Sequence, residues 1–245
     1  MKKKVIIAAG IILIVVTAVG ILAVSISGKT GIMQKSEERN NSGDQEAQSQ
    51  FDLGIKYQNG QGVKKDEAEA VKCYRKAAEL GHAKAQFNLG IMYENGLGVE
   101  KDEAEAVKWY RKSAEQGIAD AQYRLGMSYA NGRGVTKDEA EARHWYRMAA
   151  EQGHAKAQFF LGHMYLKGQG GVKDGNKAEY WFRKASEQGD DLSSFSLCIM
   201  YSMGNGVKKD EAEALKWMRK AADQGNEIAI QCFEKQRHLN GGAGQ

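Results

Sequence analysis

Cysteine and histidine are the residue types in this chain with the widest chemistry, because at short fixed spacings they bind metal ions or pair as nucleophile and base. Three cysteines and five histidines are present: Cys73, Cys198, Cys232, His82, His144, His154, His163 and His238. They form neither a C-x-x-C pair nor an H-E-x-x-H pattern, and no calcium-binding loop occurs. We therefore expect no metal site and no cofactor.

Pairs of acidic residues are a second possible source of chemistry, since two carboxylates can act as general acid and base. Four aspartates are each followed by a glutamate three residues later: Asp66 and Glu69, Asp102 and Glu105, Asp138 and Glu141, Asp210 and Glu213. An enzyme needs one such site, whereas equally spaced copies are what helix capping predicts. No G-x-S-x-G motif or phosphate-binding glycine loop accompanies them. We therefore expect no catalytic residues and no enzyme activity.

The composition limits the class of partner. The chain has 245 residues, of which 42% are apolar and 27% charged, as in a globular protein. Lysine and arginine number 35 against 31 aspartates and glutamates, a near balance that argues against binding nucleic acid through bulk charge. The 29 glycines and the lack of proline place chain reversals at glycine. We expect a protein partner, no nucleic acid and no small-molecule substrate.

A repeat of constant length positions these residues. From Ala47 the chain divides into five blocks of 36 residues: 47–82, 83–118, 119–154, 155–190 and 191–226. All four tryptophans, Trp109, Trp145, Trp181 and Trp217, share one column of the aligned blocks, and Cys73 takes that place in the first block. Repeats of this length stack into a solenoid, because one unit cannot bury its apolar face alone.

Each block predicts two helices joined by a glycine turn. The first helix, such as residues 83–94, ends in Asn95-Gly96-Leu97-Gly98-Val99, and the second begins after the aspartates named above. The second helix ends at a glycine in every block: Gly81, Gly117, Gly153, Gly189 and Gly225. Two blocks depart from the pattern, because Lys177 replaces the capping glutamate of the fourth and Cys198 replaces the packing glycine of the fifth.

The pattern A-x-A-Q-F-x-L-G-x-x-Y-x-x-G-x-G-V-x-x-D-x-x-x-A-x-x-W-Y-x-x-A-A-x-x-G, present over residues 83–117, resembles the Sel1-like repeat, a relative of the tetratricopeptide repeat. The resemblance covers residues 47–226. It implies an all-α, right-handed α-solenoid of helix-turn-helix units that serves as an adaptor or scaffold, often in bacteria. The resemblance also leaves a hydrolase-type enzyme as the weakest alternative, since such activity is known only in distant cysteine-rich relatives. A further amphipathic helix with Ile228, Ile230, Phe233 and Leu239 is expected within residues 227–245, as a cap on the last repeat.

The cysteines leave one alternative open. Cys73, in the tryptophan column, is expected to be a small buried apolar residue. Cys198 and Cys232 lie on successive predicted helices, where either two free thiols or a disulfide bond is possible.

The N-terminal residues 1–27 predict a membrane anchor. Three lysines precede an uncharged apolar run from Val5 to Val24, which as a helix spans roughly 30 Å, the thickness of a bilayer core. The lysines favour a cytoplasmic N-terminus and a repeat domain on the periplasmic or extracellular side of a bacterial inner membrane. A signal peptide cleaved near Ser25 or Ser27, which gives a secreted protein, is the alternative. Residues 28–46 are polar and predict a flexible linker.

The partner is expected on the concave face, where first helices line a solenoid and non-packing positions are free to vary. Two variable columns are candidates: Asp52, Asn88, Arg124, Phe160 and Ser196, and then Lys56, Met92, Ser128, Met164 and Met200. In the fourth block Phe160, His163, Met164 and Leu166 form an apolar and aromatic set typical of a binding hot spot. The sequence therefore predicts a membrane-anchored, non-catalytic adaptor.

Overall fold

The computed structural model describes residues 42–241, and their side chains up to residue 235. The predicted membrane span over residues 1–27 and residues 28–41 of the predicted linker lie outside the described residues. Between residues 42 and 241, no helix is both long and apolar enough to cross a membrane.

All regular elements in this part of the chain are α-helices. A first helix covers residues 42–59. The others follow as α2 (Glu67–Glu79), α3 (Ala83–Asn95), α4 (Glu103–Glu115), α5 (Ala119–Asn131), α6 (Glu139–Glu151), α7 (Ala155–Lys167), α8 (Gly175–Glu187), α9 (Asp191–Met203), α10 (Glu211–Asp223) and α11 (Glu227–Gly241).

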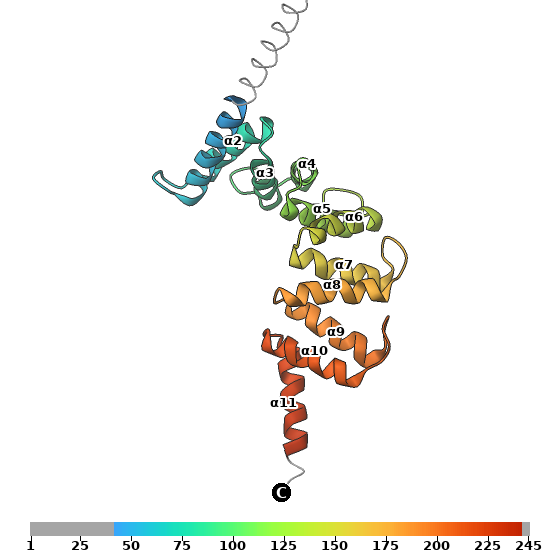
Figure 1. The fold of residues 1–245 in the computed structure, drawn as a ribbon. Coiled ribbons are helices and arrows are strands. Elements are labelled where there is room, and N and C mark those ends of the chain that lie inside the picture. The colour runs from blue at the N-terminus through green and yellow to red at the C-terminus, as the bar shows by residue number, and fades with distance from the viewer. Residues whose placement is uncertain (1–41, 242–245) are drawn as a thin grey trace, which may run out of the picture.

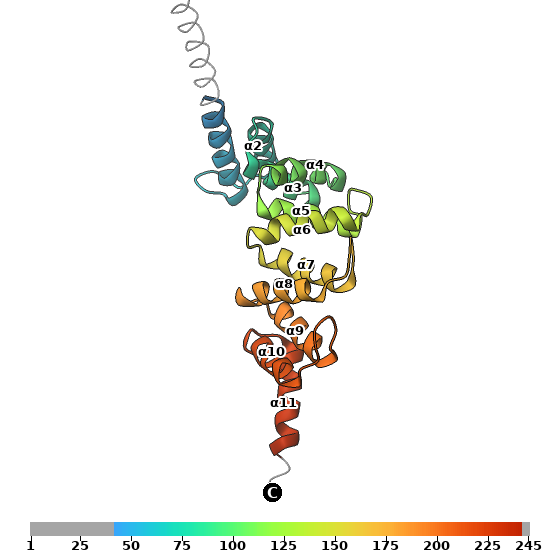
Figure 2. The ribbon, with the colours of Figure 1, turned by 45° about the vertical axis from the view of Figure 1, so that its right-hand side comes forward.

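Neighbouring helices along the chain pack against each other, so the molecule is an elongated stack rather than a sphere (Figure 1). The two helices of each repeat form a pair, and the pairs follow one another along the stack in both views (Figure 2). Helix α11 leaves the end of the stack beyond α10. The predicted α-solenoid is confirmed, while its right-handed sense stays a prediction.

Aspartate caps begin the second helices, as predicted. The carboxylate oxygen of Asp102 accepts a hydrogen bond from the backbone N–H of Glu105 at 2.9 Å, and the same bond recurs at Asp66, Asp138 and Asp210. Asp174 caps α8 in the same way although its partner is Lys177. The cap therefore depends on the aspartate, because it satisfies backbone donors at the helix start.

His82 and His154 directly follow glycines that end second helices, but their side chains serve the next element. Each is the N-cap of the following first helix, where Nδ1 accepts the N–H of the third residue at 3.1 Å. Their rings stack on Phe51 at 4.5 Å and Tyr123 at 4.6 Å. An imidazole nitrogen can therefore act in place of a capping aspartate while its ring packs against the previous repeat.

Close packing within each pair depends on glycine facing an aromatic ring. A Cβ atom on Gly90 would lie 2.6 Å from ring carbons of Tyr110, and Gly54, Gly126 and Gly162 face Tyr74, Tyr146 and Phe182 in the same way. In the last pair Cys198 occupies the glycine position and Met218 occupies the aromatic position, and both belong to the same apolar cluster. The larger residue is therefore matched by a narrower, more adaptable partner.

Buried glutamines link successive repeats. The side-chain amides of Gln86, Gln122 and Gln158 donate to the carbonyl oxygens of Ala78, Ala114 and Ala150 in the preceding repeat, at 3.0–3.1 Å. Their own amide oxygens accept from Gln116, Gln152 and Gln188 at 2.7–2.8 Å. Ser194 takes the equivalent place in the last repeat. This glutamine ladder satisfies backbone carbonyls that are shielded from water at each junction.

Two predictions at the ends of the repeats are wrong in part. Residues 42–46, assigned to the linker, belong to the first helix, because Ala47 is buried and the helix extends a turn beyond it. The C-terminal helix exists, but Ile228 is 57% exposed, and it is the small Ala229 that is fully buried. Ile230 and Phe233 of the predicted face are half-buried, so among residues 227–235 Ile228 is the member of that face that turns away from the stack. Leu215 of α10 is also exposed.

Candidate functional site

The first variable column lies on an accessible face of the first helices. Asp52 is exposed, Asn88, Arg124 and Ser196 are half-buried, and Phe160 is 36% exposed. Phe160 is the large apolar member of this column, and its ring stacks on that of Tyr146 with centroids 5.5 Å apart and planes 12° apart. An aromatic residue is therefore accessible at the junction between the third and fourth repeats.

The second variable column is not a free surface, and that prediction is wrong. Lys56 is exposed, but Met92, Ser128, Met164 and Met200 are buried. Four residues advance an α-helix by about 400°, so this column is turned by about 40° from the first, toward the neighbouring helices. The methionines therefore vary within the core, where this flexible side chain fills irregular gaps.

A set of three positions recurs at each junction between repeats on this face. It comprises the first-column residue, the aromatic residue of the preceding second helix, and a residue near the end of the preceding first helix. The sets are Gln58, Tyr74 and Asn88; Glu94, Tyr110 and Arg124; Ala130, Tyr146 and Phe160; and Leu166, Phe182 and Ser196. We call them junctions one to four.

Hydrogen bonds hold the first two junctions together. The hydroxyl of Tyr74 donates to Oε1 of Gln58, and that of Tyr110 donates to Oε2 of Glu94, both at 2.6 Å. Arg124 forms an ion pair with the same Glu94 oxygen at 3.2 Å. Burial and the Glu94 carboxylate both raise the pKa of Tyr110, so its hydroxyl stays protonated as the donor.

Junction three lacks the acceptor. Within the described part of the chain the Tyr146 hydroxyl has no hydrogen-bond partner, because Ala130 stands where Gln58 and Glu94 stand at the earlier junctions. The hydroxyl is not among the fully buried unpaired polar atoms of the described residues, which are Trp109 Nε1 and Ser193 Oγ, so water can reach it. Burial, the largest cause, and the nearby Tyr123 raise the pKa of Tyr146, so this hydroxyl also remains a donor. The donor is present and nothing in the described chain accepts from it.

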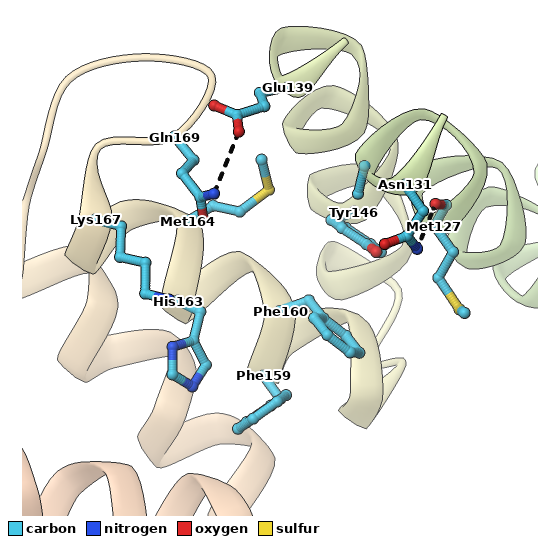
Figure 3. A pocket seen from close by; sticks show the side chains of 11 residues that line it. Met127, Asn131, Glu139, Tyr146, Phe159, Phe160, His163, Met164, Lys167 and Gln169 are labelled. Carbon is cyan, nitrogen blue, oxygen red and sulfur yellow. Dashed lines mark hydrogen bonds between the residues drawn. The ribbon is translucent and has the colours of Figure 1, made fainter. Parts of the chain in front are cut away.

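A cavity of about 340 Å³ opens at this junction, between α5, α6 and α7 (Figure 3). Its lining includes the unpaired tyrosine and the exposed phenylalanine: Met127, Ala130, Asn131, Glu139, Tyr146, Phe159, Phe160, His163, Met164, Lys167 and Gln169. Apolar and aromatic side chains with a few polar groups are typical of a ligand pocket, and the volume is at the small end of that class.

Of the two charged side chains that line this cavity, Glu139 is paired and Lys167 forms no ion pair within residues 42–235. Glu139 forms an ion pair with Lys137 at 3.2 Å and accepts from the Gln169 amide at 3.3 Å. His163 packs against Phe159 and Phe182, and burial, followed by the positive charge of Lys167, lowers its pKa. His163 is therefore neutral near pH 7.

His163 and Ser196 provide the residue types of a base and a nucleophile, so the hydrolase alternative can be tested here. Nε2 of His163 is 3.5 Å from Oγ of Ser196, at the limit for a hydrogen bond. The serine hydroxyl instead donates to the carbonyl of Leu192 at 2.8 Å, and among the described residues no carboxylate orients the histidine. This geometry does not activate a nucleophile.

The described part of the chain holds no group of three or more metal-binding side chains. Cys73, Cys198 and Cys232 are free thiols, and Cys73 is buried as expected. Cys198 and Cys232 both line a second cavity between α9, α10 and α11 without a bond between them. Of the two alternatives for this pair, the structure has the free thiols.

The predicted hot-spot residues are brought together in part. Phe160, His163 and Met164 line the cavity at junction three, but Leu166 belongs to junction four, beside Gly206. Sequence reasoning missed Tyr146, Phe159, Met127 and Lys167. One signal was available, because Ala130 is the smallest residue in a column that otherwise holds Gln58, Glu94, Leu166 and Ser202.

Comparisons with known proteins agree on one architecture. The model of the Sel1 repeat matches residues 47–82, 83–118, 119–154, 155–190 and 192–226. A Sel1 repeat protein from Oxalobacter formigenes is 41% identical with a TM-score of 0.72, and the match covers 76% of each chain. A protective antigen of uropathogenic Escherichia coli is 43% identical with the same TM-score, over 75% of this chain but 39% of its own. No curated protein matches the chain.

Proposed function

Because the chain belongs to the Sel1 repeat family, we propose that it is a non-catalytic adaptor of the bacterial envelope that binds a protein partner on the concave face of its solenoid. Proteins of this family are in general scaffolds for protein interactions rather than enzymes. The stack of helices offers a long face on which a partner can be held without any bond being made or broken.

One observation carries the proposal. Phe160 exposes an aromatic ring at the edge of a cavity whose lining includes Tyr146, Met127 and Phe159 beside polar residues such as Asn131 and Lys167. Exposed aromatic residues beside a pocket are the commonest energetic centres of protein interfaces. The other members of its column, such as Asp52 and Ser196, are polar, so the centre of the interface is expected at junction three.

The envelope location rests on the N-terminal sequence. Twenty uncharged, mostly apolar residues from Val5 to Val24 follow three lysines, which supports a single-pass anchor in the inner membrane with the repeats on the periplasmic or extracellular side. Anchoring would raise the concentration of a bound partner at the membrane surface. Secretion after cleavage of a signal peptide is the alternative for the same residues.

A site-specific photocrosslink in cells tests both parts. A crosslinking residue at Phe160 is compared with one at Lys112, which is exposed on the second helix α4. We expect one protein to be captured in the membrane fraction from position 160 alone. Equal capture of many proteins from both positions would contradict the binding face. Recovery of a shortened chain outside the membrane would replace the anchor by the secreted form.

The captured protein then allows a quantitative check. Phe160→Ala in the full chain should weaken its binding by about 30-fold, the effect of removing a hot-spot side chain worth about 2 kcal/mol. Lys112→Ala is the matched control, because it removes an exposed side chain of similar length far from the cavity. Equal affinities for the two variants would contradict the assignment of Phe160.

A further inference from the structure

An arginine of the second helix and a tyrosine of the next first helix form a recurring pair in this chain. In three places the arginine donates a hydrogen bond to the tyrosine hydroxyl: Arg75 to Tyr93, Arg111 to Tyr129, and Arg183 to Tyr201. Arg147 and Tyr165 hold the same positions in the third and fourth repeats, yet within residues 42–235 no hydrogen bond joins them, and the Tyr165 hydroxyl has no hydrogen-bond partner. The pair is therefore broken at one place only.

A different arginine lies against Tyr165. The guanidinium carbon of Arg143 is 4.0 Å from the centre of the Tyr165 ring. The same guanidinium donates to the carbonyl oxygen of Val172 at 3.2 Å and to that of Gln169 at 3.5 Å. Stacking and two carbonyl acceptors hold this group in place, because the planar guanidinium can use its face and its N–H groups at once.

Two departures from the repeat make room for Arg143. Buried valines, Val71 and Val107, hold its position in the first two repeats. Gly171 stands where the second and third repeats have a loop valine that packs against the core, and a Cβ atom on Gly171 would collide with Nη1 of Arg143. An apolar contact between two valines has thus been exchanged for a guanidinium facing a glycine.

A cavity of about 370 Å³ opens beside this guanidinium, between α6, α8 and the loop that joins α7 to α8. Its lining includes three cations, Arg143, Arg147 and Lys177, together with Tyr165, and no described carboxylate lines it. Lys177 stands where the other four repeats have a glutamate. We call this space the arginine cavity. Tyr165 is five residues from Phe160, a rotation of about 140° on the helix, so the arginine cavity lies on another side of α7.

The cations of the arginine cavity are only loosely paired within the described chain. Arg143 forms no ion pair there. Nε of Arg147 is 3.9 Å from Glu151, and Nζ of Lys177 is 3.1 Å from Asp174. The side chains of Arg147 and Lys177 are 52% and 60% exposed, so water and salt screen both pairs. A ligand can therefore compete for these cations at little cost.

We propose that the arginine cavity binds a phosphate monoester group. Guanidinium groups match phosphate oxygens with paired N–H donors, a lysine adds a point charge, and the Tyr165 hydroxyl is free to donate to an oxygen as well. A phosphate monoester carries nearly two negative charges and three free oxygens, enough for three cations, whereas a carboxylate offers one charge and two oxygens. Either a soluble phosphate monoester or the headgroup of phosphatidic acid presents this group.

Calorimetric titration of the full chain in detergent with glycerol 3-phosphate tests the proposal, because this probe carries the group shared by both sources. We expect saturable binding tighter than about 1 mM. Acetate, which carries a carboxylate, should bind at least about tenfold more weakly. Titration without saturation, or acetate binding as tightly as glycerol 3-phosphate, would overturn the proposal.

Two variants assign the binding to the arginine cavity. Arg147→Gln removes an exposed guanidinium, and Lys177→Glu restores the glutamate of the other repeats; each should weaken glycerol 3-phosphate binding by about tenfold, the effect of one hydrogen bond between charged groups. Both residues are exposed, so the variants should fold, as thermal unfolding checks. Arg111→Gln, in an intact pair, and Lys84→Glu, an exposed charge reversal on α3, are the controls and should leave the affinity unchanged. Unchanged affinity in the first two variants, or an equal loss in the controls, would contradict the site.

Lipid discs distinguish the two sources of the phosphate group. The full chain is reconstituted in discs of phosphatidylcholine with and without phosphatidic acid, and glycerol 3-phosphate is titrated into each. Apparent affinity that falls severalfold with phosphatidic acid, but not in Lys177→Glu, would assign the site to the lipid headgroup. Equal affinity in both discs would assign it to a soluble phosphate monoester. None of these measurements involves Phe160, so the proposed function stands or fails separately.

Discussion

Replacing Gly90 by alanine tests whether the glycine and aromatic pairs set the packing of the repeats. The added Cβ would lie 2.6 Å from both Cδ1 and Cε1 of Tyr110 and 3.3 Å from the carbonyl oxygen of Ala106. Carbon atoms in contact are normally 3.5–4.0 Å apart, so the ring must move by about 1 Å. That ring is buried, and its hydroxyl is held by Glu94 at 2.6 Å.

The size and the sign of the effect can both be estimated. Overpacking of a well-packed core costs about 1–3 kcal/mol, whereas alanine gains up to about 1 kcal/mol over glycine within a helix. We expect Gly90→Ala to lower the free energy of unfolding by about 1–2 kcal/mol, measured as the urea midpoint from far-UV circular dichroism. A variant about 1 kcal/mol more stable than the parent chain would refute the steric reasoning, because that is the result at an unobstructed helical site.

A double-mutant cycle isolates the contact. The last repeat pairs Cys198 with Met218, so Tyr110→Met gives Gly90→Ala a similarly flexible neighbour. In the Tyr110→Met background the added methyl group should cost at least 1 kcal/mol less than in the parent chain, a coupling within the range for residues in contact. Additive effects of the two substitutions would show that the cost comes from elsewhere in the helix.

Three further outcomes follow from the caps and the tryptophan column. Burial lowers the pKa of His82 and His154 below their ordinary 6.5, so their protonation favours the unfolded chain: stability should be full above pH 6.5 and fall as the pH drops below it. Replacing both by asparagine, which also caps, should reduce that dependence in urea titrations between pH 7.5 and 5. Trp145→Phe should lower the free energy of unfolding by about 1 kcal/mol more than Trp109→Phe does. The reason is that the indole N–H of Trp145 donates to a carboxylate at 3.1 Å, whereas that of Trp109 is unpaired within the described chain. Equal urea midpoints for the two variants would disprove this expectation. Lys177→Glu gains a favourable interaction with the helix dipole in the first turn of α8 but loses the ion pair between Lys177 and Asp174 at 3.1 Å. Its free energy of unfolding should therefore stay within about 0.5 kcal/mol of the parent chain, and a larger change in calorimetry would count against this balance.

The sequence could predict whatever depends on local and repeated interactions. Aspartate caps such as Asp102 and helix-ending glycines such as Gly81 use neighbouring backbone groups, so their spacing along the chain is enough to find them. The glycine and aromatic columns recur at one period and therefore also appear in the sequence.

The candidate site depends on contacts between repeats, and these were only partly predictable. Phe160 was recognised as an exposed aromatic residue, but the vacancy beside it arises from Ala130 and Tyr146, which belong to the preceding repeat. Met92 and Met164 were expected on the surface because they vary, yet variation also occurs in a core where flexible side chains repack. A variable column can therefore mean either an exposed surface or a core that repacks. To decide between them one must know how each helix is rotated about its own axis, and the sequence column does not contain that information.

The glutamine ladder has a mechanical consequence. Because Gln86, Gln122 and Gln158 each link one repeat to the carbonyl of the repeat before it, a pull along the stack loads these bonds in series, and the weakest junction opens before its neighbours. Each 36-residue repeat that opens adds roughly 120 Å of extended chain. A chain held at one end by a membrane and at the other by a partner would then lengthen in steps and keep both attachments under load.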